Sequence, residues 1–361
     1  MIKKVLLAMS GGIDSSVAAI LLKQQNFQLE GITFRSYDSM KESCIAKEKG
    51  CCTADSIFGA KHLAETLGFP HSIIDTRKLF KDTVIQNFID EYLAGNTPNP
   101  CVLCNKIIKW GEIFNLLNIN DISYLSTGHY ARIAYENGRY FLRKAIDTKK
   151  DQTYFLWTLS QENLAKTLFP LGELSKTEVR EIARQNGFYD IAEKKESQEI
   201  CFIVNDDYRD FLRQQIPDLD AKIGEGNFIN KDGKILGKHK GYPFYTIGQR
   251  KGLVIALGQP AFVTNINAAT NTITLGKRED IMTKEFWLKD VNFMKYQSIP
   301  DDFCATCKVR YKSPDAKATI TQIGDKLKVV FEENIFAITP GQSAVIYEND
   351  DVVAGGIILG I

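Results

Sequence analysis

The sequence has no apolar run long enough to cross a membrane. A spanning helix needs about 20 consecutive apolar residues, whereas the apolar stretch near the N-terminus, residues 5–9, ends at Ser10-Gly11-Gly12. That stretch is also shorter than the roughly 7–15 residues of a signal-peptide core. A buried first strand fits it better. We therefore expect a cytoplasmic protein without a membrane partner.

Cysteines are few, and neither sign of charge is in excess. Eight cysteines in 361 residues are too sparse for a disulfide scaffold, so in a reducing compartment they are buried fillers, metal ligands or reactive thiols. The formal charge of +1 argues against a histone-like protein. A nucleic-acid partner is still possible, because binding needs only a local basic face.

The first part of the chain alternates between strand and helix patterns, which is typical of parallel βαβ units. The expected strands are 5–9, 29–34, 71–75 and 124–127, and the expected helices are 15–24, 56–67 and 79–93. A hairpin with an Asn137-Gly138 turn follows, and then helices at 152–169 and 176–185.

Beyond about residue 205, glycine, lysine and turn residues multiply, and from 261 short alternating strands dominate. These patterns predict a small domain followed by a β-barrel or sandwich. We predict an α/β fold: a doubly wound parallel sheet in residues 1–204, a small central domain in 205–275 and a C-terminal β-barrel in 276–361.

The stretch LLAMSGGIDSSVAA, residues 6–19, is a strand, a glycine turn and a helix start. Gly11 and Gly12 allow a ligand to approach the backbone, and the N–H groups of a helix N-terminus attract an anion. Ser10 and Ser15 add hydroxyl donors, and Asp14 could orient the loop or help to hold Mg²⁺. The alternative is a capped helix after a buried strand. The sequence has neither G-x-x-x-x-G-K-[ST] nor G-x-G-x-x-G, which argues against a kinase-type phosphate loop and a dinucleotide-binding fold.

Two Cys-x-x-Cys pairs stand at 101/104 and 304/307. Zinc ribbons place such pairs ~15–20 residues apart, so these pairs fit one poorly, and we expect Cys304 and Cys307 to be buried fillers. Cys104 precedes an expected helix at 105–117.

Lys106 and Lys109 lie close to Cys104 in sequence, and nearby cations and a helix N-terminus favour a thiolate. Cys201 lies in an expected short apolar strand, where it is either a reactive thiol or a core cysteine.

Ser10-Gly11-Gly12-Ile13-Asp14-Ser15 resembles the SGGxDS signature of the PP-loop ATP pyrophosphatases. Seven further motifs, in order and over nearly the whole chain, resemble the bacterial tRNA-specific 2-thiouridylase family. They are TPNPCVLCNKIIKW (97–110), TGHYAR (127–132), DQTYFL (151–156), SQEICFI (197–203), YTIGQRKGL (245–253), VRYKSPDAKA (309–318) and PGQSAVIY (340–347).

The resemblance implies that ATP activates the C2 oxygen of the wobble uridine as an adenylate. A persulfide sulfur on Cys201 is then delivered to C2, and Cys104 closes a disulfide with Cys201 as the sulfur leaves. AMP is a good leaving group, and a thiolate or persulfide is a strong nucleophile. The implied partners are tRNAs for Lys, Glu and Gln and a persulfide donor protein, a cysteine desulfurase or a relay.

The resemblance also implies binding residues. The nucleotide positions are Ala8, Met9, Ser10, Gly11, Gly12, Ile13, Asp14, Ser15, Phe34 and Gly128. The tRNA positions are Asn99, Pro100, Cys101, His129, Lys150, Asp151, Gln152, Arg310, Tyr311 and Gln342. As isolated charge runs, the basic stretches around several of these residues would be solvated faces, and His129 alone would be a structural histidine at a strand end.

One position departs from the family pattern. Many relatives carry an aspartate where this chain has Cys101. Cys101, Cys104 and Cys201 together could hold a [4Fe-4S] cluster with one open iron site, and such a cluster could carry the sulfur in place of a persulfide.

Overall fold

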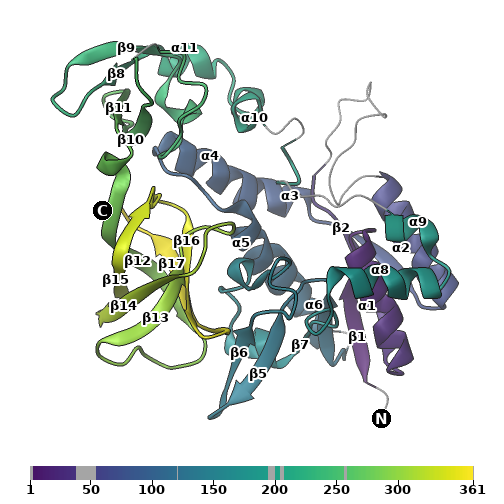
Figure 1. Ribbon diagram of the computed structural model, residues 1–361. Coiled ribbons are helices and arrows are strands. Elements are labelled where there is room, and N and C mark those ends of the chain that lie inside the picture. The colour runs from purple at the N-terminus through teal and green to yellow at the C-terminus, as the bar shows by residue number, and fades with distance from the viewer. Residues whose placement is uncertain are drawn as a thin grey trace.

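The computed structural model describes residues 3–37, 54–119, 121–193, 200–203, 207–255 and 258–360. Cys44, Cys51, Cys52 and residues 197–199 of the SQEICFI motif lie outside the described residues. Within the described ranges, no helix combines the length and the apolar character that a membrane crossing requires. Figure 1 shows an N-terminal α/β part, a small central part and a C-terminal barrel.

The N-terminal part is built on a parallel sheet of order β3-β2-β1-β4-β7. Its strands are β1 (Lys4–Ala8), β2 (Gln28–Arg35), β3 (His71–Asp75), β4 (Tyr124–Thr127) and β7 (Thr167–Leu168). The central strand β1 is apolar on both faces: Leu6 packs into one core cluster, and Val5 and Leu7 pack into another. A strand buried on both sides is what a doubly wound sheet requires.

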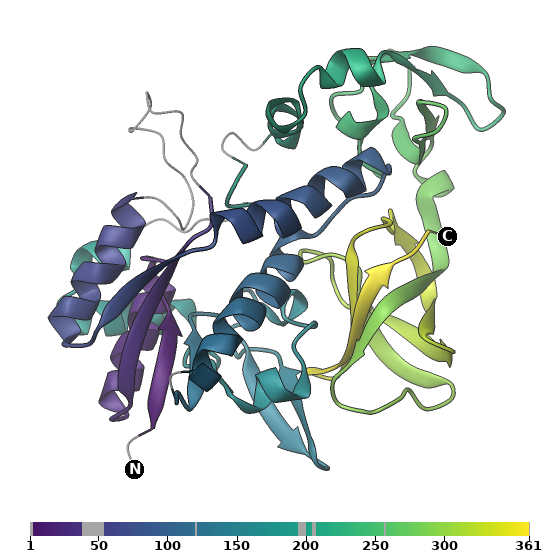
Figure 2. The same cartoon turned by 180° about the vertical axis from the view of Figure 1, so that it is seen from behind.

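Helices cover the two faces of this sheet. On the face of Val5 and Leu7 they are α1 (Ile13–Gln24), α2 (Ala54–Leu67), α8 (Lys176–Gln185) and α9 (Tyr189–Glu193). On the face of Leu6 they are the π-helical segment η3 (Asn105–Glu112) and α6 (Ile113–Ile119). The predicted helix at 79–93 is observed as α3 (Arg77–Phe80), the π-helical segment η2 (Lys81–Ile85) and α4 (Gln86–Leu93) in direct succession. Figure 2 shows this helical stretch running from the parallel sheet to the central part of the molecule.

The predicted single helix at 152–169 is wrong. This region forms a 3₁₀ turn η4 (Thr153–Phe155), a short helix α7 (Gln161–Ala165) and the strand β7. Ser160 starts α7 with a capping box, because its hydroxyl accepts from Asn163 N–H while the Asn163 side chain accepts from Ser160 N–H. The capping box marks a new helix start at this point of the sequence.

The predicted hairpin is present as β5 (Arg132–Glu136) and β6 (Arg139–Arg143). It does not stay with the parallel sheet but pairs with the barrel, where Arg143 lies opposite Asp351. An ion pair over 2.5 Å joins the same two residues. The hairpin therefore links the N-terminal part to the C-terminal part.

The central part is a small sheet of order β10-β11-β8-β9. Its strands are β8 (Gly226–Ile229), β9 (Ile235–His239), β10 (Phe262–Asn267) and β11 (Thr272–Gly276), with the helices α10 (Tyr208–Gln215) and α11 (Leu219–Ile223) and a 3₁₀ turn η5 (Tyr242–Phe244) beside them. The Tyr208 ring stacks on Tyr92 of α4 with 4.3 Å between ring centroids. One apolar cluster thus joins the central part to the helical stretch.

A 3₁₀ turn η6 (Glu279–Ile281) leads into the barrel, which has the strand order β12-β15-β14-β13-β16-β17 and is closed by pairing of β12 with β17. The strands are β12 (Met282–Phe293), β13 (Phe303–Lys308), β14 (Ala316–Ile323), β15 (Lys326–Phe336), β16 (Ser343–Glu348) and β17 (Asp351–Ile358). The predicted α/β fold with a C-terminal barrel is confirmed. Cys307 is buried as expected, but Cys304 is exposed, because alternate residues of β13 face opposite sides.

Candidate active site

The loop between β1 and α1 has the close packing that a nucleotide loop needs. Gly11 has φ +66°, and a Cβ there would lie 2.0 Å from the Ser56 carbonyl oxygen. Ser15 Oγ accepts from Ser10 N–H over 3.2 Å and donates to the Gly12 carbonyl over 3.1 Å. The serine therefore holds the loop in shape, while Ser10 itself is exposed.

The remaining nucleotide candidates support the loop or lie at its edge. Met9 and Ile13 are buried, and Ala8 is half-buried at the end of β1. Met9 is fixed through its backbone, whose N–H donates to the Ile32 carbonyl over 2.7 Å. Phe34 is half-buried and packs against two of the core clusters. These residues pack on the protein side of the loop and support its conformation.

Gly128 closes the loop from the neighbouring strand. A Cβ at this position would lie 2.7 Å from the Asp14 carbonyl carbon and from the Ser15 nitrogen. Only glycine allows such an approach of two backbones. The end of β4 thus lies directly against the first turn of α1.

Asp14 is held by two donors that the sequence did not reveal. Tyr130 Oη donates to Asp14 Oδ1 over 2.8 Å, and Lys176 Nζ donates to the same oxygen over 2.7 Å. Lys176 is the first residue of α8, and a capping box of Ser175 and Glu178 fixes that helix start. This capping box is visible in the sequence, but the contact across 162 positions is not.

The helix that carries Cys104 begins earlier than predicted. Asn99 Oδ1 accepts from Val102 N–H over 3.4 Å, and Pro100 is the first residue of α5 (Pro100–Cys104). This is a preferred helix start, because proline lacks the N–H that a first turn leaves unpaired. The π-helical segment η3 (Asn105–Glu112) and α6 (Ile113–Ile119) continue directly from α5.

Because the helix starts early, the thiol at its N-terminus is that of Cys101 and not that of Cys104. Cys101, and not Cys104, lies in the first turn, where the helix dipole favours a negative charge. Solvent reaches the Cys101 side chain, but protein atoms surround the thiol and raise its pKa to about 11. The Cys104 thiol adds to this rise in pKa, and Lys109 opposes it. A protonated Cys101 beside Cys104 follows.

Cys104 and Cys201 are half-buried and pack against the same apolar cluster. The predicted strand around Cys201 is wrong, since Ile203 N–H donates to the Ile200 carbonyl and the segment turns. Burial raises the pKa of the Tyr37 hydroxyl, and the Cys201 charge adds to that rise. In the described part of the chain, no three His, Cys, Asp or Glu side chains are grouped so as to hold a metal ion.

His129 connects the nucleotide loop with the cysteine helix. It follows Gly128, and its Nε2 lies 3.5 Å from Lys109 Nζ, while Nδ1 lies 2.7 Å from Thr127 Oγ1. An ammonium group only donates, so Nε2 is the acceptor and Nδ1 carries the proton. Loss of water and the Lys109 charge lower the His129 pKa well below its usual value. The imidazole is therefore neutral.

The barrel braces the loop before Cys101. Gln342 Nε2 donates to the Thr97 carbonyl over 3.1 Å and to the Pro98 carbonyl over 2.8 Å. Thr97 N–H in turn donates to the Pro340 carbonyl over 2.9 Å. A Cβ on Gly341 would lie 2.9 Å from the Thr97 carbonyl oxygen. The motifs TPNPCVLCNKIIKW (97–110) and PGQSAVIY (340–347) are therefore in contact.

The three neighbouring tRNA candidates at 150–152 differ in their surroundings. Asp151 is 5% exposed and accepts from Ala145 N–H and from the Thr153 hydroxyl. Burial raises the Asp151 pKa. Gln152 is committed to Tyr130, exchanging a bond in each direction. In this conformation the hydrogen bonds of Asp151 and Gln152 are made within the protein, and Lys150, like Gln152, is half-buried.

The two tRNA candidates after β13 lie at the joint between barrel and N-terminal part. Arg310 Nη2 donates to the Phe336 carbonyl over 2.7 Å. Its Nε is buried and has no hydrogen-bond partner among the described residues, and burial lowers the guanidinium pKa. The half-buried Tyr311 ring lies 4.5 Å from the Phe155 ring.

Comparison with known proteins gives the family of the chain. Three family models match in succession: the tRNA methyl transferase HUP domain at residues 3–205, the tRNA methyl transferase PRC-barrel domain at 209–277 and the aminomethyltransferase β-barrel domain at 283–358. The tRNA-specific 2-thiouridylase of Cytophaga hutchinsonii is 47% identical over 98% of this chain and 97% of its own. The chain belongs to the tRNA-specific 2-thiouridylase family.

The tRNA-specific 2-thiouridylase of Amoebophilus asiaticus is 48% identical over 98% of this chain and 95% of its own. A solved complex of a 4-thiouridine synthetase with RNA and bound ATP aligns with 61% of this chain and 52% of that one, at 20% identity and a TM-score of 0.36. So low a similarity says nothing about the site. The family membership rests on the full-length relatives.

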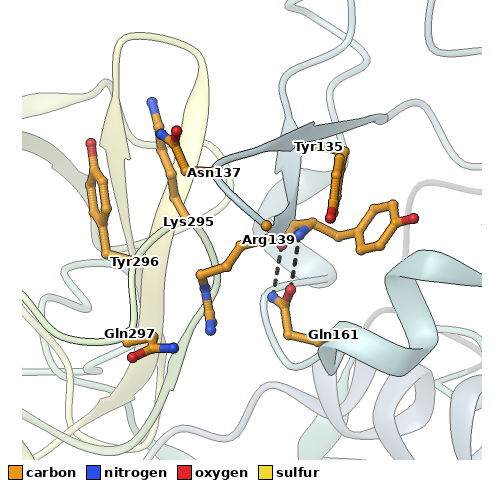
Figure 3. A pocket seen from close by; sticks show the side chains of 9 residues that line it. Tyr135, Asn137, Arg139, Gln161, Lys295, Tyr296 and Gln297 are labelled. Carbon is orange, nitrogen blue, oxygen red and sulfur yellow. Dashed lines mark hydrogen bonds between the residues drawn. The ribbon is translucent and has the colours of Figure 1, made fainter.

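A pocket of about 480 Å³ lies away from these motifs, between the β5–β6 hairpin and residues 295–297 after β12 (Figure 3). Its polar groups already hold the hairpin to the barrel. Arg139 donates to the Phe293 and Met294 carbonyls, and Gln161 pairs with the Tyr140 backbone. Lys295 is bound by Glu348 and Asp351. The pocket is part of a structural joint.

Proposed function

We propose that this protein thiolates tRNA at the C2 position of a uridine, using ATP to activate the oxygen that sulfur replaces. The observation that supports this most directly is that two adjacent residues, Gly128 and His129, contact the loop at residues 10–15 and the helix of Cys104, respectively. Gly128 packs on the nucleotide loop, and His129 contacts Lys109 of the helix that carries Cys104. These contacts support a single site for the proposed adenylation and sulfur-transfer steps, as a two-step reaction requires.

In the first step the uridine C2 oxygen attacks the α-phosphorus of ATP, forming a C2–O–P bond and releasing pyrophosphate. Pyrophosphate would occupy the loop at residues 10–15, whose N–H groups and helix start favour an anion. The Mg²⁺ that accompanies ATP supplies charge neutralisation when bound, and Asp14 has the carboxylate such an ion prefers.

In the second step the sulfur of a Cys201 persulfide bonds to C2 and AMP leaves. Cys104 then attacks Cys201 Sγ, so that a disulfide forms as the S–S bond of the persulfide breaks and its electron pair stays with the transferred sulfur. The proposed donor of that sulfur is a persulfide-bearing protein. Because the described residues show no group of three metal-binding side chains, we assign no step to an iron–sulfur cluster.

The tRNA would reach the site along the joint between barrel and N-terminal part. Asn99, Pro100 and Cys101 begin α5, and the Cys101 side chain is open to solvent. The remaining proposed contacts are His129, Lys150, Arg310, Tyr311 and Gln342. Specific RNA recognition stacks splayed bases on aromatic or guanidinium planes, and Tyr311 and Arg310 are adjacent residues of those types. The tRNAs for Lys, Glu and Gln are the proposed substrates.

The test is thiolation in vitro with tRNA, ATP and a persulfide donor, followed by nucleoside mass spectrometry. Wild-type protein should form 2-thiouridine and release pyrophosphate. Cys104→Ser and Cys201→Ser should form none, while Cys304→Ser, at an exposed barrel position, should match the wild type. Thiolation by either of the first two variants at the wild-type rate contradicts the assignment. Anaerobic measurement of iron and acid-labile sulfide tests for a cluster.

A further inference from the structure

Two donors from distant parts of the chain converge on one oxygen atom of Asp14. Tyr130 comes from the segment after β4, and Lys176 is the first residue of α8. Both of their hydrogen bonds end on Oδ1, at 2.8 Å and 2.7 Å. The Lys176 ammonium also lies 5.7 Å from the centre of the Tyr130 ring, within the range of a cation–π contact. The three side chains form one unit.

Both donors of this unit are largely buried. The Lys176 side chain is 11% exposed and that of Asp14 is 34% exposed, and Tyr130 is buried. A lysine so little exposed needs a charged partner. The Ser175–Glu178 capping box fixes the backbone of α8 next to Lys176. Gln152 fixes the backbone of Tyr130 in the same way, by exchanging two hydrogen bonds with it.

The second carboxylate oxygen of Asp14, Oδ2, differs from Oδ1 in its contacts. Within the residues that the structure describes, Asp14 Oδ2 accepts no hydrogen bond. It belongs to the first turn of α1, beside the loop in which Gly11 packs on the Ser56 carbonyl and against which Gly128 packs. A carboxylate oxygen in such a place suits a magnesium ion carried by nucleotide phosphates.

We propose that Lys176 and Tyr130 are positioning residues, which hold Asp14 by Oδ1 so that Oδ2 binds the Mg²⁺ of MgATP. This inference rests on the proposed use of ATP but not on sulfur transfer. Lys176 does not contact phosphate in this scheme. It acts through Asp14, so its removal weakens the binding of MgATP more than the binding of ATP without metal.

The experiment is calorimetric titration of the full-length protein with MgATP, and with ATP in the presence of EDTA, without tRNA or sulfur donor. The wild type should prefer MgATP. Lys176→Met and Tyr130→Phe should each lower that preference, Lys176→Met by roughly tenfold, the size expected for a charged hydrogen bond. Lys176→Arg, which keeps the charge and the donors, should restore most of it.

Lys295→Met is the matched control, because Lys295 is another little-exposed lysine, 14% exposed, held by two carboxylates in the barrel. It should lower the melting temperature and leave the preference for MgATP unchanged. Equal losses for MgATP and metal-free ATP in Lys176→Met would make Lys176 a phosphate ligand and overturn the proposal. An unchanged preference in folded Lys176→Met and Tyr130→Phe would also overturn it. Absence of thiolation alone would affect only the proposed function.

Discussion

Gln342 donates a hydrogen bond to the carbonyl of Pro98 over 2.8 Å, and the two residues are 244 positions apart. A second bond from the same amide reaches Thr97. The barrel therefore fixes the backbone that leads into α5, and the position of Cys104 depends on a contact made by the last part of the chain. The resemblance marks Gln342 as a tRNA contact, and the structure gives it this bracing role in addition.

Replacing Gln342 should impair catalysis more than nucleotide binding. Gln342→Ala removes two donors, each contributing about 1 kcal/mol, and Gln342→Glu brings an acceptor against two carbonyls. We expect a severalfold lower kcat in thiolation, with Glu worse than Ala, and an unchanged Kd for MgATP. Gln322→Ala, which removes a barrel glutamine bound to Ile299 and Gly324, is the control. Equal kcat values for Gln342→Ala and wild type would refute the bracing role.

Gly128→Ala should abolish nucleotide binding in a protein that still folds. The added Cβ would lie 2.7 Å from two backbone atoms of α1, and backbone cannot move aside as a side chain can. Gly59→Ala is the control, since nothing lies within 4 Å of its Cβ and alanine favours a helix by up to about 1 kcal/mol. Calorimetric titration with MgATP decides the matter. Unchanged affinity in Gly128→Ala would remove this residue from the site.

Acid should destabilise the protein in part through His239. Burial lowers the pKa of this imidazole from about 6.5 to about 4, and its Nδ1 accepts from Gly241 N–H. Because the folded state favours the neutral ring, this stabilisation is complete above pH 6.5 and is lost as the pH falls toward 4. The loss amounts to roughly 3 kcal/mol at most. Thermal unfolding between pH 4 and 7.5 should fall less steeply for His239→Gln than for wild type, and parallel curves would contradict this.

Substitutions of Lys150 and Asp151 should distinguish an effect on tRNA binding from an effect on the stability of the fold. Lys150→Ala should weaken tRNA binding and lower the melting temperature less than Asp151→Ala does. Asp151→Ala should lower the melting temperature, because the buried Ala145 N–H and Thr153 hydroxyl lose their acceptor, at about 1–3 kcal/mol per unsatisfied group. Filter binding and thermal unfolding of both variants provide the comparison. A large loss of tRNA affinity in a fully stable Asp151→Ala would restore it as a direct contact.

Local signals predicted most of the elements but missed the long-range contacts. The strand–helix alternation located β1 to β4 within a residue or two, because buried parallel strands are short apolar runs. The helix at 100–104 was missed although Asn99-Pro100 is a start signal. The segment 152–169 has apolar residues at helical spacing, yet the capping box at Ser160 divides it.

The candidate site was predicted through motifs, and what the motifs omit is the packing between them. Nothing local indicates that the β5–β6 hairpin joins the barrel, that Lys176 reaches Asp14, or that Gln342 reaches Pro98. Each of these contacts is between residues more than 150 positions apart. Their partners are specified by the whole fold and not by spacing along the chain.

The brace at Gln342 also sets an order of events during synthesis. The ribosome makes the segment with Cys104 early. It makes Gln342 and the last two strands only near the end, since β16 begins directly after Gln342. A nascent chain can therefore form its parallel sheet and the loop at residues 10–15 while the segment around Cys101 and Cys104 still lacks the hydrogen bonds from Gln342. Thiolating competence arrives late, once the last two strands have sealed the barrel.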